Sequence, residues 1–316
     1  MDVSNALGKW GISGELCEKI EIHGSPERSE WRSVVKSDSS EKFLLEEIWP
    51  FQISTRKRIA QAQEELSSNG LNAVFPYLKS EAGEFVGEAD GRFWMLSPFI
   101  EGLELTRPDY IYDEWRGKLL SDWLIALGKK SDEVSSFGKD AVFDLKAYCF
   151  KIYRDVMLND PYILPQVSPI FSYLRKEDGF FENYHKLPTS FCHGDFHALN
   201  VIWGEESINA VIDWEFCGYK PELYDVANMV GCFGIENPAG LKKGACPAFI
   251  KNLCEGGFGE NVGWENFTKT VLALRFAWLA EWLRKKDKEM TSLELDYMTL
   301  LLDSEKELNS SWGILD

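Results

Sequence analysis

Three polar side chains in one short segment have the types and the spacing that phosphoryl transfer requires. Asp195 closes a His-Gly-Asp triplet, Asn200 stands five positions later, and Asp213 ends the second of two apolar runs. The runs cover 201–203 and 208–212, and a polar turn separates them. This order predicts a loop, a strand, a tight turn and a second strand. Such a hairpin beneath a loop would bring the three side chains together.

The chemistry of phosphoryl transfer assigns a role to each of the three. The reaction needs positioning, neutralisation of the phosphate charge by magnesium, and a carboxylate that receives the proton of the acceptor hydroxyl. Magnesium prefers oxygen ligands and keeps several of its waters, so one carboxylate and one amide are sufficient protein ligands. We therefore expect Asp195 to be the catalytic base, and Asn200 and Asp213 to hold Mg²⁺ against the triphosphate of ATP.

Three ordered motifs carry a family resemblance. Residues 193–200, 212–214 and 224–227 read HGDFHALN, IDW and YDVA. This set resembles the catalytic and metal-binding segments of the aminoglycoside phosphotransferase and choline kinase superfamily, whose pattern is HGDxHxxN, then IDW or IDF, then DLA. A single His-Gly-Asp triplet would be weak evidence. The three pieces together identify the superfamily and leave the acceptor substrate open.

The resemblance implies a fold. Members of this superfamily are small-molecule kinases with a bilobal, protein-kinase-like α+β fold. We expect a small, mainly antiparallel β N-lobe at residues 1–101 and a larger α-helical C-lobe at residues 102–316, which would contain the catalytic β-hairpin. The segment 97–102 resembles the hinge of the family, where backbone groups hydrogen-bond adenine. Ser97 and Phe99 are the expected adenine contacts.

The resemblance also implies supporting roles around the catalytic loop. His193 is expected to brace the loop, Asp225 to hydrogen-bond it, and His197 to serve a structural role near the site. A competing interpretation is that the aspartates only cap backbone amides in turns, as Asp commonly does. That interpretation is reasonable for Asp195 or Asp213 taken singly, and the complete set of motifs argues against it.

Hydrophobic periodicity agrees with the two expected lobes. The predicted strands cover 17–23, 31–36, 42–48, 73–78 and 91–96, and a predicted helix covers 54–66. The predicted helices of the second lobe cover 112–127, 142–157, 169–184, 224–233, 266–286 and 292–308.

One departure from the family pattern lies on the third predicted strand. Glu46 occupies the position where the family carries a lysine for the α- and β-phosphates. A carboxylate there would repel a triphosphate unless another group reverses the local charge. We hypothesise an inverted pair, in which an arginine of the run 56–58, taken as Arg58, reaches the phosphates and Glu46 orients it. Arg28 and Lys36 are rival phosphate contacts.

Two alternatives to the inverted pair stay open. The basic run 56–58 would equally suit a solvated helix face, and the strand register could be displaced by a residue or two. The glycine-rich phosphate loop of many kinases is also absent, because the first turn, 24–26, contains one glycine.

The acceptor site has weaker signals. Glu215 follows the IDW motif, as in choline and ethanolamine kinases, and Trp278 and Trp282 share one face of a predicted helix. Aromatic faces and carboxylates are suited to a quaternary ammonium group. Core packing of the two tryptophans is the competing interpretation. Choline-like amino alcohols, amino sugars or sugars, and aminoglycosides all remain candidate substrates.

Composition excludes some classes of function. The chain has 316 residues and a formal net charge of −17, which disfavours binding to nucleic acid or to an anionic membrane. The first residues lack the basic and apolar pattern of a signal peptide, and no apolar run is long enough to span a membrane. The seven cysteines are scattered without a CxxC pair, which favours reduced structural thiols over a metal site. We expect a cytoplasmic protein, and its oligomeric state is not predicted.

These observations favour an enzyme that transfers the γ-phosphate of ATP, with Mg²⁺, to a hydroxyl of a small molecule. The alternative is a catalytically weak or inactive pseudokinase that binds nucleotide as a regulatory protein. Glu46 at the lysine position argues for the alternative. The intact trio of Asp195, Asn200 and Asp213 argues for the enzyme.

Overall fold

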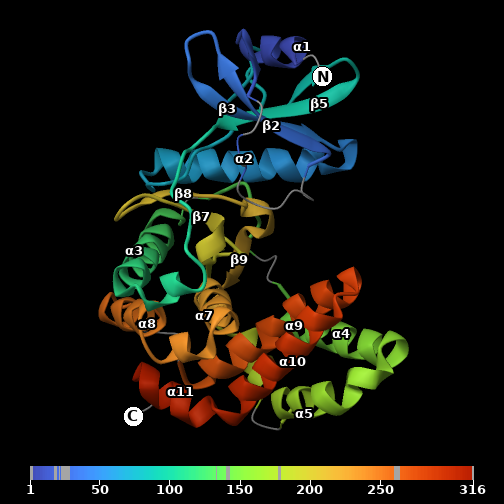
Figure 1. Ribbon diagram of the computed structural model, residues 1–316, viewed down its shortest axis with the longest axis vertical. Helices are drawn as coiled ribbons and strands as arrows, with labels where there is room; N and C mark the ends of the chain where they lie inside the picture. Colours follow the sequence, from blue (N-terminus) through green and yellow to red (C-terminus); the bar gives the residue numbers. More distant parts are fainter. Residues whose placement is uncertain are drawn as a thin grey trace. The chain divides into compact units, whose positions relative to one another are not determined.

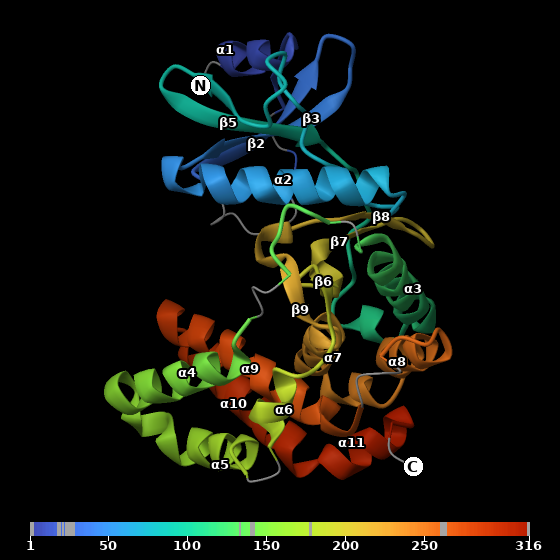
Figure 2. The same ribbon diagram turned by 180° about the vertical axis from the view of Figure 1, so that it is seen from behind.

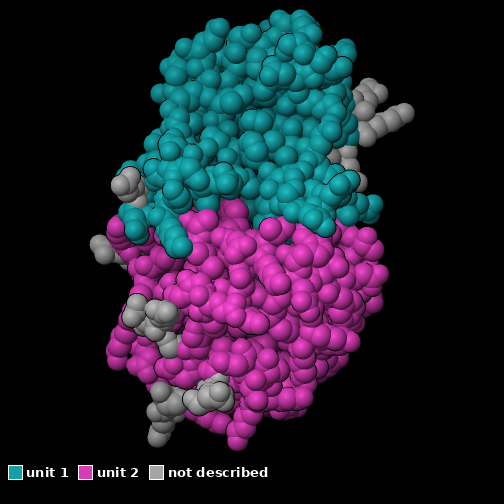
Figure 3. Space-filling model, turned by 90° about the vertical axis from the view of Figure 1, so that its left-hand side faces the viewer, with its two compact units in different colours: residues 1–104, 129–138, 199–217 teal, residues 105–128, 139–198, 218–316 magenta. Residues whose placement is uncertain are grey.

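The computed structural model describes residues 3–17, 20, 22, 29–132, 134–139, 143–176, 179–259 and 264–314. The chain divides into two compact units, which Figure 3 distinguishes by colour. Unit 1 contains residues 1–104, 129–138 and 199–217, and unit 2 contains residues 105–128, 139–198 and 218–316. Unit 1 therefore takes up two segments that follow the expected hinge. The division into functional lobes near residue 101 stays a prediction.

A five-stranded antiparallel sheet forms the centre of unit 1 (Figure 1). The spatial order is β1-β2-β3-β5-β4. The strands are β1 (Gly14–Leu16), β2 (Trp31–Ser37), β3 (Lys42–Ile48), β4 (Gly87–Ala89) and β5 (Arg92–Pro98). The register of the central strands places Arg32 of β2 and Met95 of β5 opposite Glu46 of β3. The predicted strand at 42–48 is confirmed, and Glu46 lies on it.

The two faces of the sheet are covered by different helices. Side chains of a strand alternate between faces. Leu45 belongs to a core that includes Leu7 of α1 (Ser4–Leu7), whereas Ile48 packs with Ala60 of α2 (Ile53–Ser68). Figure 2 shows α2 lying along the sheet. Because Glu46 stands two positions before Ile48, its carboxylate points to the α2 face.

One of the strands predicted for the sheet is wrong, and another falls mostly outside the described residues. The segment 73–78 has no strand conformation, although the Leu78 amide donates to the Leu96 carbonyl oxygen at 2.7 Å. Pro76 offers no amide hydrogen for a strand ladder, which disfavours a central strand. The fourth strand is β4, further along the chain. The first strand is β1, and most of the predicted strand at 17–23 lies outside the described residues.

A second, two-stranded sheet in unit 1 is the predicted hairpin. It pairs β7 (Val201–Trp203) with β8 (Ile208–Val211). A 3₁₀ turn (Ala198–Asn200) leads into β7, and another (Trp214–Phe216) follows β8. This hairpin is joined to the rest of unit 1 by the Val211 amide, which donates to the carbonyl oxygen of Ala73 at 2.8 Å.

Unit 2 is mainly helical. Its helices are α3 (Glu114–Lys130), α4 (Leu145–Asn159), α5 (Leu164–Leu174), α6 (Phe180–Tyr184), α7 (Tyr224–Glu236), α8 (Ala245–Glu255), α9 (Phe267–Lys285), α10 (Lys288–Asp303) and α11 (Glu305–Trp312). The predicted helices at 169–184 and 292–308 are each divided in two. A short antiparallel pair, β6 (Thr189–Cys192) with β9 (Gly218–Pro221), was not predicted.

Helix α9 is central to unit 2, because it contacts α4, α7 and α10. This position explains why ten of its residues are buried, including the charged Arg275. Within the described part of the chain, no helix has both the length and the apolar character that crossing a membrane demands.

Candidate active site

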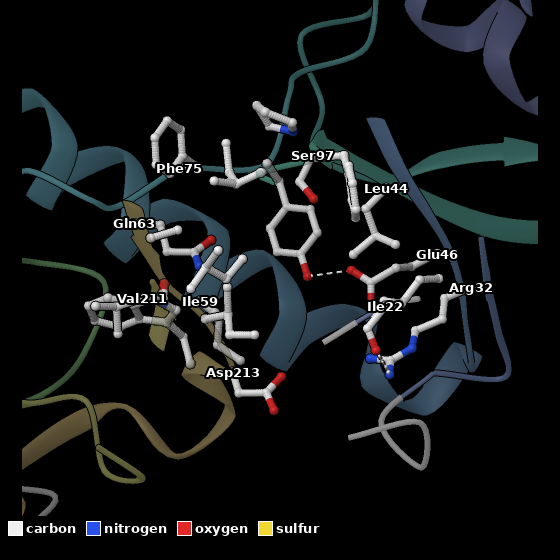
Figure 4. A pocket seen from close by; sticks show the side chains of 18 of the residues that line it. Ile22, Arg32, Leu44, Glu46, Ile59, Gln63, Phe75, Ser97, Val211 and Asp213 are labelled. Atoms are coloured by element: carbon white, nitrogen blue, oxygen red, sulfur yellow. Dashed lines mark hydrogen bonds between the residues drawn. The ribbon is translucent and has the colours of Figure 1, made fainter. Parts of the chain in front are cut away.

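A pocket in unit 1 is lined by Glu46, the residue that departs from the family pattern (Figure 4). Its cavity has a volume of about 110 Å³, which is less than the ~300–1,000 Å³ of typical ligand pockets. The described residues that line it come from unit 1 alone: Ile22, Arg32, Leu44, Glu46, Arg56, Ile59, Gln63, Phe75, Tyr77, 97–100, Ile202 and 210–215.

Helix α2 directs one arginine at this pocket. Arg56, Ile59 and Gln63 are buried at positions i, i+3 and i+7, so they share the face of α2 that packs against the sheet. Arg56 lines the pocket, with 7% of its side chain exposed. Arg58 stands two positions later on the helix and is exposed, and its guanidinium lies 5.1 Å from the ring centre of Phe137.

Glu46 and Arg56 are connected through a tyrosine. The Tyr77 hydroxyl donates to Oε2 of Glu46 at 2.7 Å, and Nη1 of Arg56 donates to the Tyr77 oxygen at 3.4 Å. Nη2 of Arg56 also lies 2.9 Å from Oε1 of Glu215. Burial, together with the Glu46 carboxylate, raises the pKa of Tyr77 well above its ordinary value. The phenol therefore stays protonated and acts as the donor to Glu46.

The pocket carries a slight excess of negative charge. Its lining has three carboxylates, Glu46, Asp213 and Glu215, and two guanidinium groups, Arg32 and Arg56, which gives a formal charge of −3 + 2 = −1. Burial alone would lower the pKa of Arg56, but the surrounding acidic groups outweigh it and raise the pKa. Arg56 is thus held in the charged form. A triphosphate entering this pocket would still need further positive charge.

Asn200 and Asp213 are positioned by one backbone hydrogen bond. The Ile212 amide donates to the Asn200 carbonyl oxygen at 2.9 Å, which places Asp213 one residue beyond the bond. Asp213 has φ 65° and ψ 53°, a left-handed conformation that is uncommon outside glycine and is best tolerated by Asn and Asp. One amide and one carboxylate oxygen are hard donors of the kind that Mg²⁺ accepts. The residues therefore fit a magnesium ion that keeps several of its waters.

In unit 2, Asp225 organises the loop that carries Asp195. The Asp225 carboxylate accepts the His193 amide at 2.6 Å and the Gly194 amide at 2.8 Å. Gly194 has φ 86°, a conformation that favours glycine. Burial raises the pKa of Asp225 to about 6, although the two amides and Lys220 oppose the rise. The predicted contact between Asp225 and the loop is present.

Two histidines and a tryptophan lie near Asp195 in the same unit. The Asp195 amide donates to Nδ1 of His193 at 3.2 Å, so the fully buried His193 braces the loop backbone. Nε2 of His197 lies 3.7 Å from Oδ1 of Asp195. The His197 ring in turn meets the Trp278 ring edge-on, with 6.0 Å between ring centres.

A comparison with known protein families identifies the family of this chain. The family model described as "Phosphotransferase enzyme family" matches residues 54–264, which is more than half of the chain. The chain belongs to this family. The predicted resemblance and the prediction of a phosphotransferase are thereby confirmed. The matched region contains the pocket helix α2, the catalytic loop and the hairpin of this phosphotransferase.

A curated relative is more distant. The phosphotransferase is 24% identical over 199 residues to a homoserine kinase of Agrobacterium fabrum. The match covers 61% of this chain and 56% of that protein, so the chain spans little more than half the length of its curated relative.

Solved structures share the fold at low sequence identity. An aminoglycoside phosphotransferase from Alicyclobacillus acidocaldarius has a TM-score of 0.62 at 12% identity, covering 97% of this chain and 94% of that one. An amicoumacin kinase bound to AMP-PNP and Ca²⁺ has a TM-score of 0.61 at 12% identity, with 90% of each chain covered. A spectinomycin phosphotransferase bound to ADP and spectinomycin has a TM-score of 0.59 at 16% identity, with 98% of each covered. The predicted α+β, kinase-like fold is confirmed.

The residues predicted for nucleotide binding have different outcomes. Glu46, Ser97 and Phe99 line the pocket, but the Phe99 amide already donates to the Lys42 carbonyl oxygen at 3.0 Å and is not the donor for a base here. Arg58 is exposed on α2 and is not among the described residues of the pocket lining, whereas its neighbour Arg56 is; the role of Arg58 stays a prediction. Arg28 lies outside the described residues, and the rival Lys36 is exposed and is not among the described residues of the pocket lining.

Sequence reasoning did not single out Arg56 within the run 56–58, and it missed Tyr77 and Arg32 as residues of the pocket lining. The signal for Arg56 was available, because Ile59, Ala60 and Gln63 mark the buried face of the helix to which it belongs. Arg32 could have been found from the register that sets it opposite Glu46. Tyr77 could not, because it was assigned to a strand that does not form.

The residues predicted for the acceptor are placed in separate units. Glu215 lines the pocket of unit 1 and its carboxylate is paired with Arg56. Trp278 and Trp282 are half-buried on α9 in unit 2, with ring centres 5.9 Å apart and planes inclined at 31°. The two rings are therefore neighbours, as the helical spacing predicted.

Proposed function

We propose that this phosphotransferase transfers the γ-phosphoryl group of ATP to the hydroxyl of a small molecule, with Asp195 as the catalytic base. The single observation that carries the proposal is the loop at 193–195. Its backbone is fixed by Asp225 from one side and by the His193 imidazole from the other, and its carboxylate is left beside His197. A base held in this way is pre-organised to accept the proton of an acceptor alcohol.

Asn200 and Asp213 would hold a magnesium ion. When bound, the ion would neutralise charge on the phosphate oxygens and orient the transferred group. The excess negative charge of the pocket supports this assignment, because a triphosphate would otherwise meet more carboxylates than cations. The left-handed backbone at Asp213 is consistent with a functional position, since such conformations cluster at ligand sites.

Arg56 is our candidate for the phosphate contact that lysine makes in the family. It is fully charged, buried, and guided by Tyr77 and Glu215. A guanidinium has five donors in a planar fork, which suits it to binding a phosphate group. Pocket residues Ser97 and Phe99 would lie beside the base of the nucleotide.

For the acceptor we propose an amino alcohol or an amino sugar. Homoserine, spectinomycin and kanamycin, which appear in the names of similar proteins and complexes, each combine hydroxyl and amino groups. The half-buried tryptophans of α9 offer aromatic faces that suit a cationic amine. Choline-like alcohols, amino sugars and aminoglycosides all satisfy this chemistry.

A non-catalytic, nucleotide-binding function is the second candidate, and Glu46 at the lysine position favours it. Two measurements separate the candidates. Thermal unfolding with ATP, with and without Mg²⁺, tests nucleotide binding, and ADP release across a panel of amino alcohols and amino sugars tests turnover. We expect Mg²⁺-dependent stabilisation by ATP and ADP release that depends on the acceptor. Stabilisation without acceptor-dependent ADP release would support the pseudokinase.

A further inference from the structure

A buried ion pair links α9 and α10 beside the catalytic loop of unit 2. Nε and Nη2 of Arg275 donate to the two carboxylate oxygens of Glu294, at 2.6 Å and 2.5 Å. The side chains are 2% and 0% exposed. Burial alone would lower the pKa of Arg275, but Glu294 outweighs it and raises the pKa, so the guanidinium stays charged. Figures 1 and 2 show α9 and α10 side by side along this contact.

Folding does not explain this pair well. Desolvating two charges costs about as much as their attraction returns, and replacing such a pair with apolar side chains of similar size is often neutral or stabilising. The geometry is nevertheless bidentate, which fixes the plane of the guanidinium as well as its position. A bidentate ion pair of this kind can fix the orientation of the side chains that contact it.

Both tryptophans of α9 touch the pair. Arg275, Trp278 and Trp282 stand at i, i+3 and i+7, which is one face of the helix. The guanidinium carbon lies 5.4 Å from the ring centre of Trp278, within range of a cation–π attraction. The indole nitrogen of Trp282 donates to Oε2 of Glu294 at 3.3 Å. The orientation of each indole is therefore coupled to the ion pair.

From Trp278 the contacts continue to Asp195. The indole meets the His197 ring edge-on at 6.0 Å, and Nε2 of His197 lies 3.7 Å from the Asp195 carboxylate. Every link in this series belongs to unit 2. We infer that the buried Arg275–Glu294 pair is a positioning device for the proposed base: it fixes the Trp278 indole, and the indole holds His197 against Asp195. This inference rests on the proposed function.

The test replaces both partners at once, with Arg275→Met and Glu294→Met in one chain, because a single replacement would leave a buried charge unpaired. We expect the thermal midpoint to stay within a few degrees of the wild type. We expect kcat for ADP release to fall at least tenfold while the KM for Mg–ATP is unchanged, since the base is displaced and nucleotide contacts are not. The matched control is Arg107→Met with Glu236→Met, another ion pair of unit 2, at 2.7 Å, for which kcat should be unchanged.

A second readout does not depend on activity. The chain has four histidines, so the imidazole signals in a ¹H–¹⁵N NMR spectrum can be assigned one by one. The His197 signals should move in the Met pair and in Trp278→Leu, which keeps the ion pair and breaks the link. They should not move in the Arg107 and Glu236 control.

The outcomes separate the two claims. Unchanged kcat together with unchanged His197 signals in the folded Met pair would overturn the positioning role. If the Met pair fails to fold, Trp278→Leu decides through the His197 signals, because Trp278 is also a candidate contact for the acceptor: displaced His197 signals support the role, and wild-type signals overturn it. An inactive wild type would refute the proposed function, and the His197 signals would then still test the structural link.

Discussion

Nη2 of Arg56 lies 2.9 Å from Oε1 of Glu215, and the two residues come from different walls of one pocket, helix α2 and the turn after β8. The same guanidinium donates to Tyr77, whose hydroxyl donates to Glu46. Arg56 thus joins a carboxylate of the sheet to a carboxylate beside Asp213. We propose that Arg56 on the helix takes the place of the lysine that the family carries on the strand.

The first prediction concerns the planar guanidinium group of Arg56. Arg56→Lys keeps the charge, but an ammonium group cannot reach Tyr77, Glu215 and a phosphate in the same geometry. Losing one charge-assisted hydrogen bond costs about 1.5–3 kcal/mol, so we expect the KM for ATP to rise by roughly tenfold or more. Arg58→Lys is the matched control on the exposed face of α2, and it should behave as wild type. Equal kinetics for both variants would remove Arg56 from the nucleotide site.

The second prediction concerns Glu46. Glu46→Lys restores the residue of the family, yet it should lower kcat/KM, because it leaves the Tyr77 hydroxyl without its acceptor and adds a cation near Arg56. The expected loss is about 1–3 kcal/mol of transition-state stabilisation. Adding Arg56→Glu should recover part of it, which a double-mutant cycle measures. Glu88→Lys, on an exposed position of the same sheet, is the control. Wild-type kinetics for Glu46→Lys would mean that Glu46 is a bystander.

The third prediction isolates the charge of the proposed metal ligand. Asn tolerates the left-handed backbone as well as Asp does, so Asp213→Asn should keep the fold and lose the Mg²⁺-dependent stabilisation by ATP. The matched control is Asp90→Asn, which should keep the Mg²⁺ dependence. Asp90 is also an aspartate of unit 1 at positive φ, 54°, and it lies in an exposed turn. Thermal shifts with ATP, with and without Mg²⁺, provide the comparison. Undiminished Mg²⁺ dependence in Asp213→Asn would contradict the assignment.

The fourth prediction concerns pH. Because burial raises the pKa of Asp225 from 3.8 to about 6, the folded protein keeps a proton between these pH values that the unfolded chain has released. Stability contributed by this group is therefore full below about pH 4 and is lost as pH rises through 6. At ~1.4 kcal/mol per pH unit, the difference corresponds to about 3 kcal/mol.

Denaturant unfolding of the wild type and of Asp225→Asn measures this effect. The difference in unfolding free energy between the two should change by about 2 kcal/mol from pH 4 to pH 6.5, with the wild type losing stability relative to the variant. Asp296→Asn, at an exposed position on α10, is the control substitution. A flat difference for Asp225→Asn would show that the carboxyl does not titrate in this window.

Local pattern was sufficient to predict the strand at 42–48, the helix at α2, and the loop, strand, turn and strand that carry the catalytic motif. Polar turns precede the strand and divide the hairpin, and Gly70 follows the helix. The pattern also predicted that Trp278 and Trp282 are neighbours, because i and i+4 on a helix always share a face.

The remaining features depend on contacts that are distant in sequence. Tyr77 reaches Glu46 from a segment without regular structure, and no local pattern indicates the direction of its hydroxyl. The ion pair between Arg275 and Glu294 joins two helices, so the sequence around either residue does not indicate which residue it pairs with. The buried face of α2 distinguishes Arg56 from Arg58, and this difference is not visible when residues 56–58 are taken as one basic run.

The central claim is transfer of a phosphoryl group from ATP to an alcohol with Asp195 as the base. The most direct measurement is ³¹P NMR of wild type and Asp195→Asn with ATP, Mg²⁺ and each acceptor of an amino alcohol and amino sugar panel. For at least one acceptor, we predict a new phosphomonoester signal that grows with ADP in the wild type and forms at least ~10²-fold more slowly in the variant. No phosphomonoester with any acceptor, or equal rates in the two proteins, would contradict it.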